Sequence, residues 1–195
     1  TSGPACTGPL PARSQRVTRM LRRQQLVLRG DRLWQYHLGI GLPYHFGVSR
    51  LRYESTQLFS GMLRITELEA VLPDNLVVAF RSGSDGDLQL DLRPHLETAK
   101  HSPVTVYLIV PAERAGANKG DGDLGRYLSV PGEEVDDETV SGRALRIPRL
   151  KPRLRLQAGL EPPSPRFTAL PLLAVTYKNG AFVPADYIPP LLRVE

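Results

Sequence analysis

The sequence has one cysteine and no long apolar run, and both scarcities narrow the class of protein. Cys6 stands alone among 195 residues, so no disulfide can form within the chain and a reducing compartment fits. No stretch approaches the ~20 apolar residues that a membrane-spanning helix needs. Residues 1–10 lack the charged region followed by an apolar stretch that marks a signal peptide. We therefore expect a protein of a reducing compartment without direct membrane insertion.

Motifs that carry catalysis or bind cofactors are also missing from the sequence. There is no GxSxG elbow, no phosphate-binding P-loop and no GxGxxG turn after a strand. The histidines are His37, His45, His95 and His101. None of them pairs with Cys or a second His at metal-ligand spacing, and the acidic loops 84–87 and 121–123 lack the ligand spacing of a calcium loop. The sequence predicts no catalytic residue, no metal site and no cofactor.

Proline and glycine, by contrast, are abundant, with 18 and 17 copies. Without a short repeat, this abundance favours many turns and short strands over long helices. No longer internal repeat is visible, so neither a propeller nor a solenoid is expected. The length suits one sizeable domain with a tail, and the apolar and charged fractions are those of an ordinary soluble globular protein.

The N-terminal region differs in composition from the rest of the chain. Residues 1–12 are small and rich in Pro and Gly, which is typical of a disordered tail. Residues 13–42 have apolar side chains at helical spacing and are expected to form a helical, Arg-rich segment. Residues 1–32 hold seven arginines against one acid, a net charge of +6, so the rest of the chain sums to −1 within the overall net charge of +5. The basic stretch Arg13–Arg32 is either a solvated helix or an arm for an acidic protein, nucleic acid or an anionic membrane. The aromatic residues that stack bases are missing from Arg13–Arg32, so nucleic acid is not expected as a partner.

From Pro43 onward apolar and polar residues alternate with a period of two, which predicts β-strands. The β-branched run 104–110 is expected to be a central strand because both of its faces are apolar. Turn residues 73–75 predict a hairpin over 67–80, and Asn179 with Gly180 predicts another before 181–183. Further strands are expected over 50–53, 59–65, 88–92, 127–130 and 167–177.

Two charged stretches complete the pattern. Residues 147–156 are extended and basic, and Pro148 and Pro152 favour a place at a sheet edge. The acidic run 133–138 favours an exposed loop, with a docking patch for a basic partner as the alternative. We therefore predict a mainly β fold, with a β-sandwich over 43–195 preceded by the helical N-terminal segment.

Short segments from Pro43 onward occur in an order and spacing that resemble those of one family. They are Pro43–Val48, Gly61–Ile65, Leu68–Val78, Leu88–Leu92, Val104–Leu108, Tyr127–Thr139, Ile147–Leu156, Leu170–Leu172 and Tyr187–Leu192. Together they resemble the TssK family, also called ImpJ or VasE, of type VI secretion baseplate proteins. The family's opening Trp–Gly stretch and Pro-Gln-His-Phe-Gln-like motif have no counterpart in residues 1–23.

The resemblance implies a fold and a role. In this family the N-terminal part is a β-sandwich shoulder, similar to that of phage receptor-binding proteins, and it attaches to the baseplate wedge through TssF and TssG. A helical neck that makes the full-length protein a homotrimer follows, and then a head. This chain stops where the shoulder would end, so we expect the trimerising neck to be absent. The family is cytoplasmic and has no catalytic activity.

Four aromatic residues are candidates for partner binding: Trp34, Tyr36, Tyr44 and Phe46. They fall where the helical segment gives way to the sandwich, and large aromatics are common interface anchors. The alternative is that they pin the helix onto the sheet. A different class of function, a β-sandwich module that binds a ligand or carbohydrate, would need a concave face lined by exposed aromatics. The single Trp counts against that function.

Overall fold

The computed structural model describes residues 46–112, 125–131, 134–136, 144–146 and 149–192. The expected tail over 1–12 and the expected helical segment over 13–42 lie outside these residues. The chain divides into two compact units. One, called the body here, comprises Gly30–Leu128 and Pro152–Glu195, and the other comprises Thr1–Arg29 and Ser129–Lys151.

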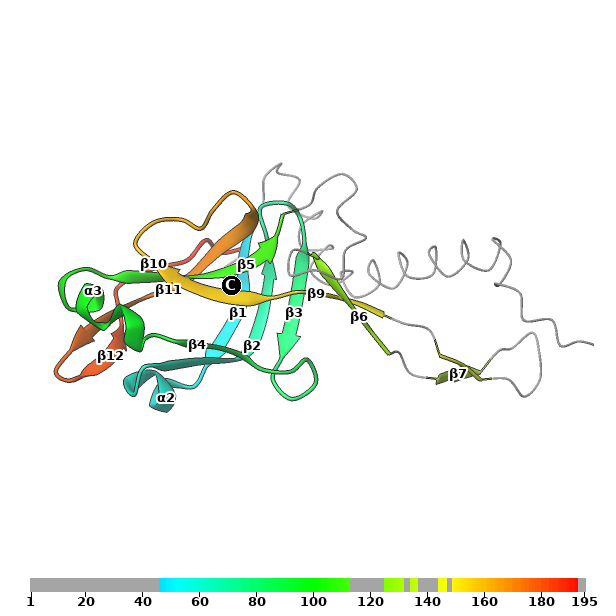
Figure 1. Cartoon of the computed structure of the whole chain (residues 1–195), viewed down its shortest axis with the longest axis horizontal. Helices are drawn as coiled ribbons and strands as arrows, with labels where there is room; N and C mark the ends of the chain where they lie inside the picture. The colour runs from blue at the N-terminus through cyan, green and yellow to red at the C-terminus, as the bar shows by residue number, and fades with distance from the viewer. Residues whose placement is uncertain (1–45, 113–124, 132–133, 137–143, 147–148, 193–195) are drawn as a thin grey trace, which may run out of the picture. The chain divides into compact units, whose positions relative to one another are not determined.

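Two four-stranded antiparallel sheets form the body (Figure 1). The first sheet contains β1 (Gly47–Tyr53), β2 (Met62–Val71), β3 (Val77–Arg81) and β4 (Leu88–Asp91). In it β2 pairs with β1 on one side, and on the other with β3 over one half and β4 over the other. The second sheet has the order β10 (Arg155–Gly159), β5 (Val104–Pro111), β11 (Phe167–Lys178) and β12 (Ala181–Pro184). The expected central strand is thus confirmed as β5, which lies between β10 and β11.

Shorter elements complete the described chain. The body also holds helix α2 (Ser55–Phe59), the 3-10 turn η1 (Arg93–His95) and helix α3 (Leu96–His101). Two further strand pairs follow: β6 (Tyr127–Val130) with β9 (Arg149–Pro152), and β7 (Glu134–Asp136) with β8 (Ala144–Arg146).

Both main clusters of buried side chains take residues from both sheets, which confirms the predicted sandwich. In one cluster Leu68 and Phe80 of the first sheet pack with Leu108 and Leu170 of the second. In the other, Leu63 packs with residues such as Val106 and Phe182. Burying this apolar surface is the main favourable contribution to folding.

A bulge in each sheet reverses which side chains face the core. On β2, Arg52 pairs with Glu67 and Tyr53 with Ile65, so Thr66 is an extra residue without a cross-strand partner on β1. The inward residues are therefore odd-numbered before Thr66 and even-numbered after it. On β11, Leu172 is the extra residue between Pro171 and Leu173. One inserted residue changes the face of everything beyond it because side chains alternate with a period of two.

The two predicted hairpins are confirmed at their turns. Strands β2 and β3 pair from Val71 opposite Val77 outward, and Asn75 between them has φ 62°. Strands β11 and β12 meet at Asn179 and Gly180, with φ values of 51° and 81°. Positive φ at both central residues is the type I′ requirement that Asn-Gly satisfies at low cost.

A buried arginine links the two sheets. Arg126 is the buried charged residue of the described chain, with 4% of its surface exposed. Its guanidinium donates hydrogen bonds to the Pro111 carbonyl at the end of β5 and to the Asp74 carboxylate in the β2–β3 turn. The hydroxyl of Thr168 on β11 donates to the same oxygen of Asp74. Each bond joins segments that are far apart in the sequence.

Residues 149–156 have the predicted place at a sheet edge, divided between two strands: β9 pairs with β6 in a two-stranded sheet, and β10 is an outer strand of the second sheet. Three expectations of the sequence need correction. Phe59 is not part of a strand but ends helix α2, because the extended chain starts again at Met62. Within the acidic run, residues 134–136 form strand β7 rather than a loop. Residues 93–101, for which no helix is expected from the pattern, form η1 and α3.

Candidate functional site

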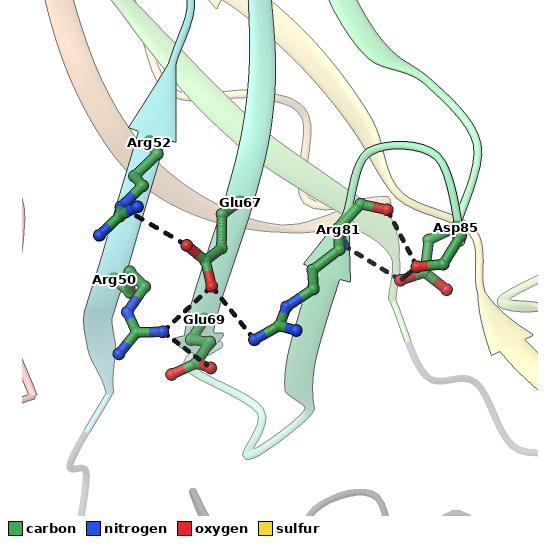
Figure 2. A network of polar contacts seen from close by, with 7 residues as sticks. Arg50, Arg52, Glu67, Glu69, Arg81 and Asp85 are labelled. Atoms are coloured by element: carbon green, nitrogen blue, oxygen red, sulfur yellow. Dashed lines mark hydrogen bonds and ion pairs between the residues drawn. The ribbon is translucent and has the colours of Figure 1, made fainter.

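The outward face of the first sheet carries a network of ion pairs that joins side chains from three strands. Leu68 and Ala70 on β2 point into the core, so the alternating Glu67 and Glu69 point away from it. Arginines from both neighbouring strands surround them, as Figure 2 shows. We call this group the charged face: Arg50 and Arg52 on β1, Glu67 and Glu69 on β2, and Arg81 on β3.

Glu67 is the centre of the charged face. Its Oε1 accepts a hydrogen bond from Nη1 of Arg50 at 3.0 Å and lies 3.4 Å from Nη2 of Arg81 (Figure 2). Its Oε2 lies 3.5 Å from Nε of Arg52. Nη1 of Arg50 also lies 3.9 Å from Oε1 of Glu69. The Glu67 side chain is consequently only 15% exposed, although it is on the outside of the sheet.

These contacts favour the ionised forms of Glu67 and Arg50 through shifts of their pKa values. The hydrogen bond from Arg50 lowers the pKa of Glu67, and the positive charges of Arg50, Arg52 and Arg81 lower that pKa further. The pKa of Arg50 is raised in turn, first by its hydrogen bond to Glu67. At neutral pH the face therefore presents three guanidinium groups against two carboxylates.

The turn beyond β3 continues the polar surface. Asp85 accepts a hydrogen bond from the main-chain N–H of Arg81 at 3.1 Å, and Ser84 donates to its carboxylate (Figure 2). Asp87 accepts a hydrogen bond from Arg64 at 2.9 Å. The acidic loop 84–87 is thus an ordinary polar turn whose two carboxylates bind nearby donors of the chain. The other acidic loop, 121–123, lies outside the described residues.

At its other end the same face becomes apolar. Val71 and Val77, which follow the outward alternation of β2 and β3, pack with Leu192 of the C-terminal segment. That segment runs beside β1: Val48 N–H donates to the Pro190 carbonyl at 2.7 Å, and Leu192 N–H donates to the Val48 carbonyl at 3.1 Å. Leu191 in this segment is 42% exposed.

The four aromatic residues expected to bind a partner are mostly outside the described chain. Trp34, Tyr36 and Tyr44 lie there, and Phe46 is the first described residue. Phe46 is half-buried and packs against the core cluster of the body. The helix that these residues would pin onto the sheet in the alternative lies outside the described chain, and the partner-binding role of the four residues stays a proposal.

The histidines and the cysteine, which were examined as candidate catalytic or metal-binding residues, do not form a cluster in the described part of the chain. His95 and His101 lie on η1 and α3, while His37, His45 and Cys6 lie outside it. Within the described ranges no three His, Cys, Asp or Glu side chains come together in a group that could hold a metal ion. Nor does any helix of these ranges have the length and apolar character needed to cross a membrane.

Sequence reasoning identified the alternating arginines of β1 but not the charged face. Arg50 and Arg52 alternate with apolar residues, and Glu67 and Glu69 do the same in the predicted hairpin. The sequence pattern that could have indicated the site is the occurrence of alternating arginines in one predicted strand and alternating glutamates in the next. It becomes a site only when the register places Arg52, Glu67 and Arg81 opposite one another across three strands.

Comparisons with known proteins agree on one family. A family model described as "Bacterial Type VI secretion, VC_A0110, EvfL, ImpJ, VasE" matches residues 24–195. The fold is similar to that of a TssK crystal structure, with a TM-score of 0.61, 22% identity, and coverage of 97% of this chain and 43% of that chain. It is also similar to a chain of a TssK–TssF–TssG baseplate subcomplex solved by cryo-electron microscopy, with a TM-score of 0.59, 19% identity, and coverage of 84% and 57%.

A third similar chain belongs to a structure of the type VI secretion baseplate complex, with a TM-score of 0.61 and 19% identity over 84% of this chain. This chain spans 57% or less of the length of each of these three solved chains. A comparison with curated protein sequences finds no match. At these identities the structural likeness establishes a shared fold.

Proposed function

Because this chain belongs to the bacterial type VI secretion family that includes ImpJ and VasE, we propose that it is a non-enzymatic structural component of the secretion baseplate. In this role it docks onto the wedge proteins TssF and TssG in the cytoplasm. The observation that carries the proposal is the family match over residues 24–195, on a sandwich fold shared with a chain solved in a TssK–TssF–TssG subcomplex.

The surface of the body supports docking as its mode of action. Stable protein interfaces combine an apolar centre with a polar rim in which Arg is enriched. The outward face of the first sheet offers the exposed arginines of the charged face, and the C-terminal segment beside β1 offers the apolar Leu191, which is 42% exposed. In full-length members of the family the same sandwich would connect the wedge to the rest of the protein. We propose that Trp34, Tyr36, Tyr44 and Phe46 contribute further anchors.

Co-elution tests the proposed function. The folded chain is mixed with the TssF–TssG complex of the same source and passed over a size-exclusion column, and we expect one common peak. A β-sandwich protein of unrelated sequence and the same net charge serves as the control for non-specific attraction. Separate elution of the folded chain and the wedge would overturn the proposal.

The aromatic anchors need a variant of their own. Trp34→Ala combined with Tyr36→Ala is expected to weaken co-elution, because truncating buried interface aromatics removes much of the binding energy. Phe46 is left intact in this variant since it packs against the core and its loss would weaken the fold itself. If the double variant binds TssF–TssG as the wild type does, Trp34 and Tyr36 are not part of the interface.

A further inference from the structure

We propose that the charged face is a docking surface for an acidic, extended segment of a protein partner. The inference deepens the proposed function, because the wedge is the first partner on which it is tested. It rests on three properties of the face: the placement of its arginines on either side of one strand, their exposure, and the excess of positive charge.

Two exposed arginines of the charged face lie on the strands on either side of β2. Arg52 on β1 and Arg81 on β3 lie opposite Glu67 on the strand between them. Since neighbouring strands are roughly 4.8 Å apart, the two flanking backbones are roughly 10 Å apart. The side chain of Arg52 is 72% exposed and that of Arg81 is 70% exposed. A segment lying along β2 would therefore meet a guanidinium on each side.

Both flanking guanidiniums have donors to spare. A guanidinium offers five N–H donors and suits a carboxylate that it binds through two of them. Among the described residues, the ion contacts of these side chains are one atom pair each, Nε of Arg52 with Glu67 at 3.5 Å and Nη2 of Arg81 with Glu67 at 3.4 Å. Neither contact is a paired, short arginine–carboxylate bond. The remaining donors are open to carboxylates from another molecule.

Glu67 prepares the face for such a ligand. The Glu67 carboxylate, which contacts all three guanidiniums, reduces their mutual repulsion and holds them in place before a partner arrives. Holding side chains in their bound positions lowers the entropy cost of association. Exposed ion pairs add little to the stability of a fold. Arginines outnumber carboxylates by one among the five residues of the face, and the two most exposed of the five are Arg52 and Arg81, so an acidic segment is favoured over a basic one.

Charge reversal of the two flanking residues tests the inference on the wedge. The variant is Arg52→Glu with Arg81→Glu. The matched control is Arg166→Glu with Lys178→Glu, which makes the same change in net charge at two exposed positions, one just before β11 and one at its last residue. We expect the control to bind TssF–TssG as the wild type does and the face variant to bind at least ten-fold more weakly. If wild type and face variant bind equally, the docking inference fails while the proposed function stands.

A peptide probe decides the inference without the wedge. Hexaglutamate is titrated into the isotope-labelled full chain, and backbone amide shifts are followed by NMR. We expect shifts of the amides of Arg50, Arg52, Glu67 and Arg81 that fade with added salt, and no such shifts with hexalysine or in the face variant. Shifts confined to the arginine-rich residues 1–32 would overturn the inference, even where the wedge binds.

The variant must be folded for either result to count. Circular dichroism and the melting temperature are compared with those of the wild type. If the charge reversal disturbs the sheet, Arg52→Gln with Arg81→Gln replaces it, because neutral side chains of similar length remove the attraction without adding repulsion. The glutamine variant is also expected to lose the hexaglutamate-dependent shifts, and unchanged shifts in it would refute the docking surface.

Discussion

Arg126 and Asp74 form an ion pair across the sandwich, with Nη2 of the arginine 2.5 Å from Oδ2 of the carboxylate. The arginine side chain is 4% exposed and the aspartate side chain 25%. Asp74 lies in the turn of the first sheet, and its second donor, Thr168, comes from the second sheet at 2.7 Å. Nη1 of Arg126 donates to the Pro111 carbonyl at 2.8 Å. One carboxylate thus joins both layers at the same end of the body.

Removing that carboxylate should destabilise the body strongly. Asp74→Ala leaves the Arg126 charge buried without its ionic partner, which costs on the order of 3–5 kcal/mol in comparable pairs. The free energy of unfolding is measured by urea titration. Combining Asp74→Asn with Arg126→Met removes both charges and is expected to recover much of the loss. A single Asp74→Ala variant as stable as the wild type would show that the pair does not hold the layers together.

The free energy of unfolding should decrease over a defined range of acidic pH. Asp91 accepts bonds from the side chain and main-chain N–H of Arg93, and these lower its pKa from 3.8 to about 2. A carboxylate with a lowered native pKa stabilises the fold above its ordinary pKa, and that contribution is lost as the pH falls through the native value. The pKa values of Glu67 and Glu97 are lowered in the same direction, first by hydrogen bonds from Arg50 and Lys100.

The measurement is the free energy of unfolding as a function of pH. We expect it to fall as the pH drops from 3.8 to about 2, and to fall less steeply in an Asp91→Asn variant, which has no carboxylate to protonate at this position. Identical slopes for the two proteins over this interval would contradict the assignment of the effect to Asp91.

Gly47 should be needed where the C-terminal segment meets β1. Its φ is +152°, and a Cβ there would lie 2.6 Å from the Pro190 carbonyl oxygen. Gly47→Ala therefore combines backbone strain, worth roughly 1–3 kcal/mol, with displacement of the segment. Hydrogen exchange of the Leu192 amide, which bonds to Val48, reports that displacement.

Gly83 provides the matched control for this substitution. It also has a positive φ, +94°, but no atom lies within 4 Å of a Cβ built on it. Gly83→Ala should therefore show the backbone strain alone and leave exchange at Leu192 unchanged. Equal exchange at Leu192 in the two variants would mean that the close approach at Gly47 is not what holds the segment.

The bulge at Thr66 should be essential for the sandwich. Deleting Thr66 puts the two halves of β2 in one alternation, so either Leu63 and Ile65 or Leu68 and Ala70 must face solvent. We expect loss of the cooperative thermal transition by circular dichroism. Thr66→Ser keeps the number of residues in β2, and therefore the bulge, and should change the free energy of unfolding by only about 0.5 kcal/mol. A cooperative transition in the deletion variant would show that the register can adapt.

Local patterns were sufficient for much of the fold. The period of two indicated the strands, and the Asn-Gly pair with Asn75 located two hairpins because turn geometry depends on the residues of the turn itself. The apolar run of β5 indicated a central strand for a similar reason, since both of its faces had to be covered. The bulge residues Thr66 and Leu172 were not predicted, because a residue of any type can be left without a cross-strand partner where the register of two strands shifts.

The amino-acid order alone determined the mainly β character of the described residues, the two hairpins and the family to which the chain belongs, because each follows from neighbouring residues or from the order of short segments. The charged face and the Arg126–Asp74 pair depended on three-dimensional packing. Arg52 meets Glu67 only through strand register, and Thr168 meets Asp74 across 94 positions only through the stacking of two sheets. Register and stacking are set by burial of the whole core, which no local pattern of residues contains.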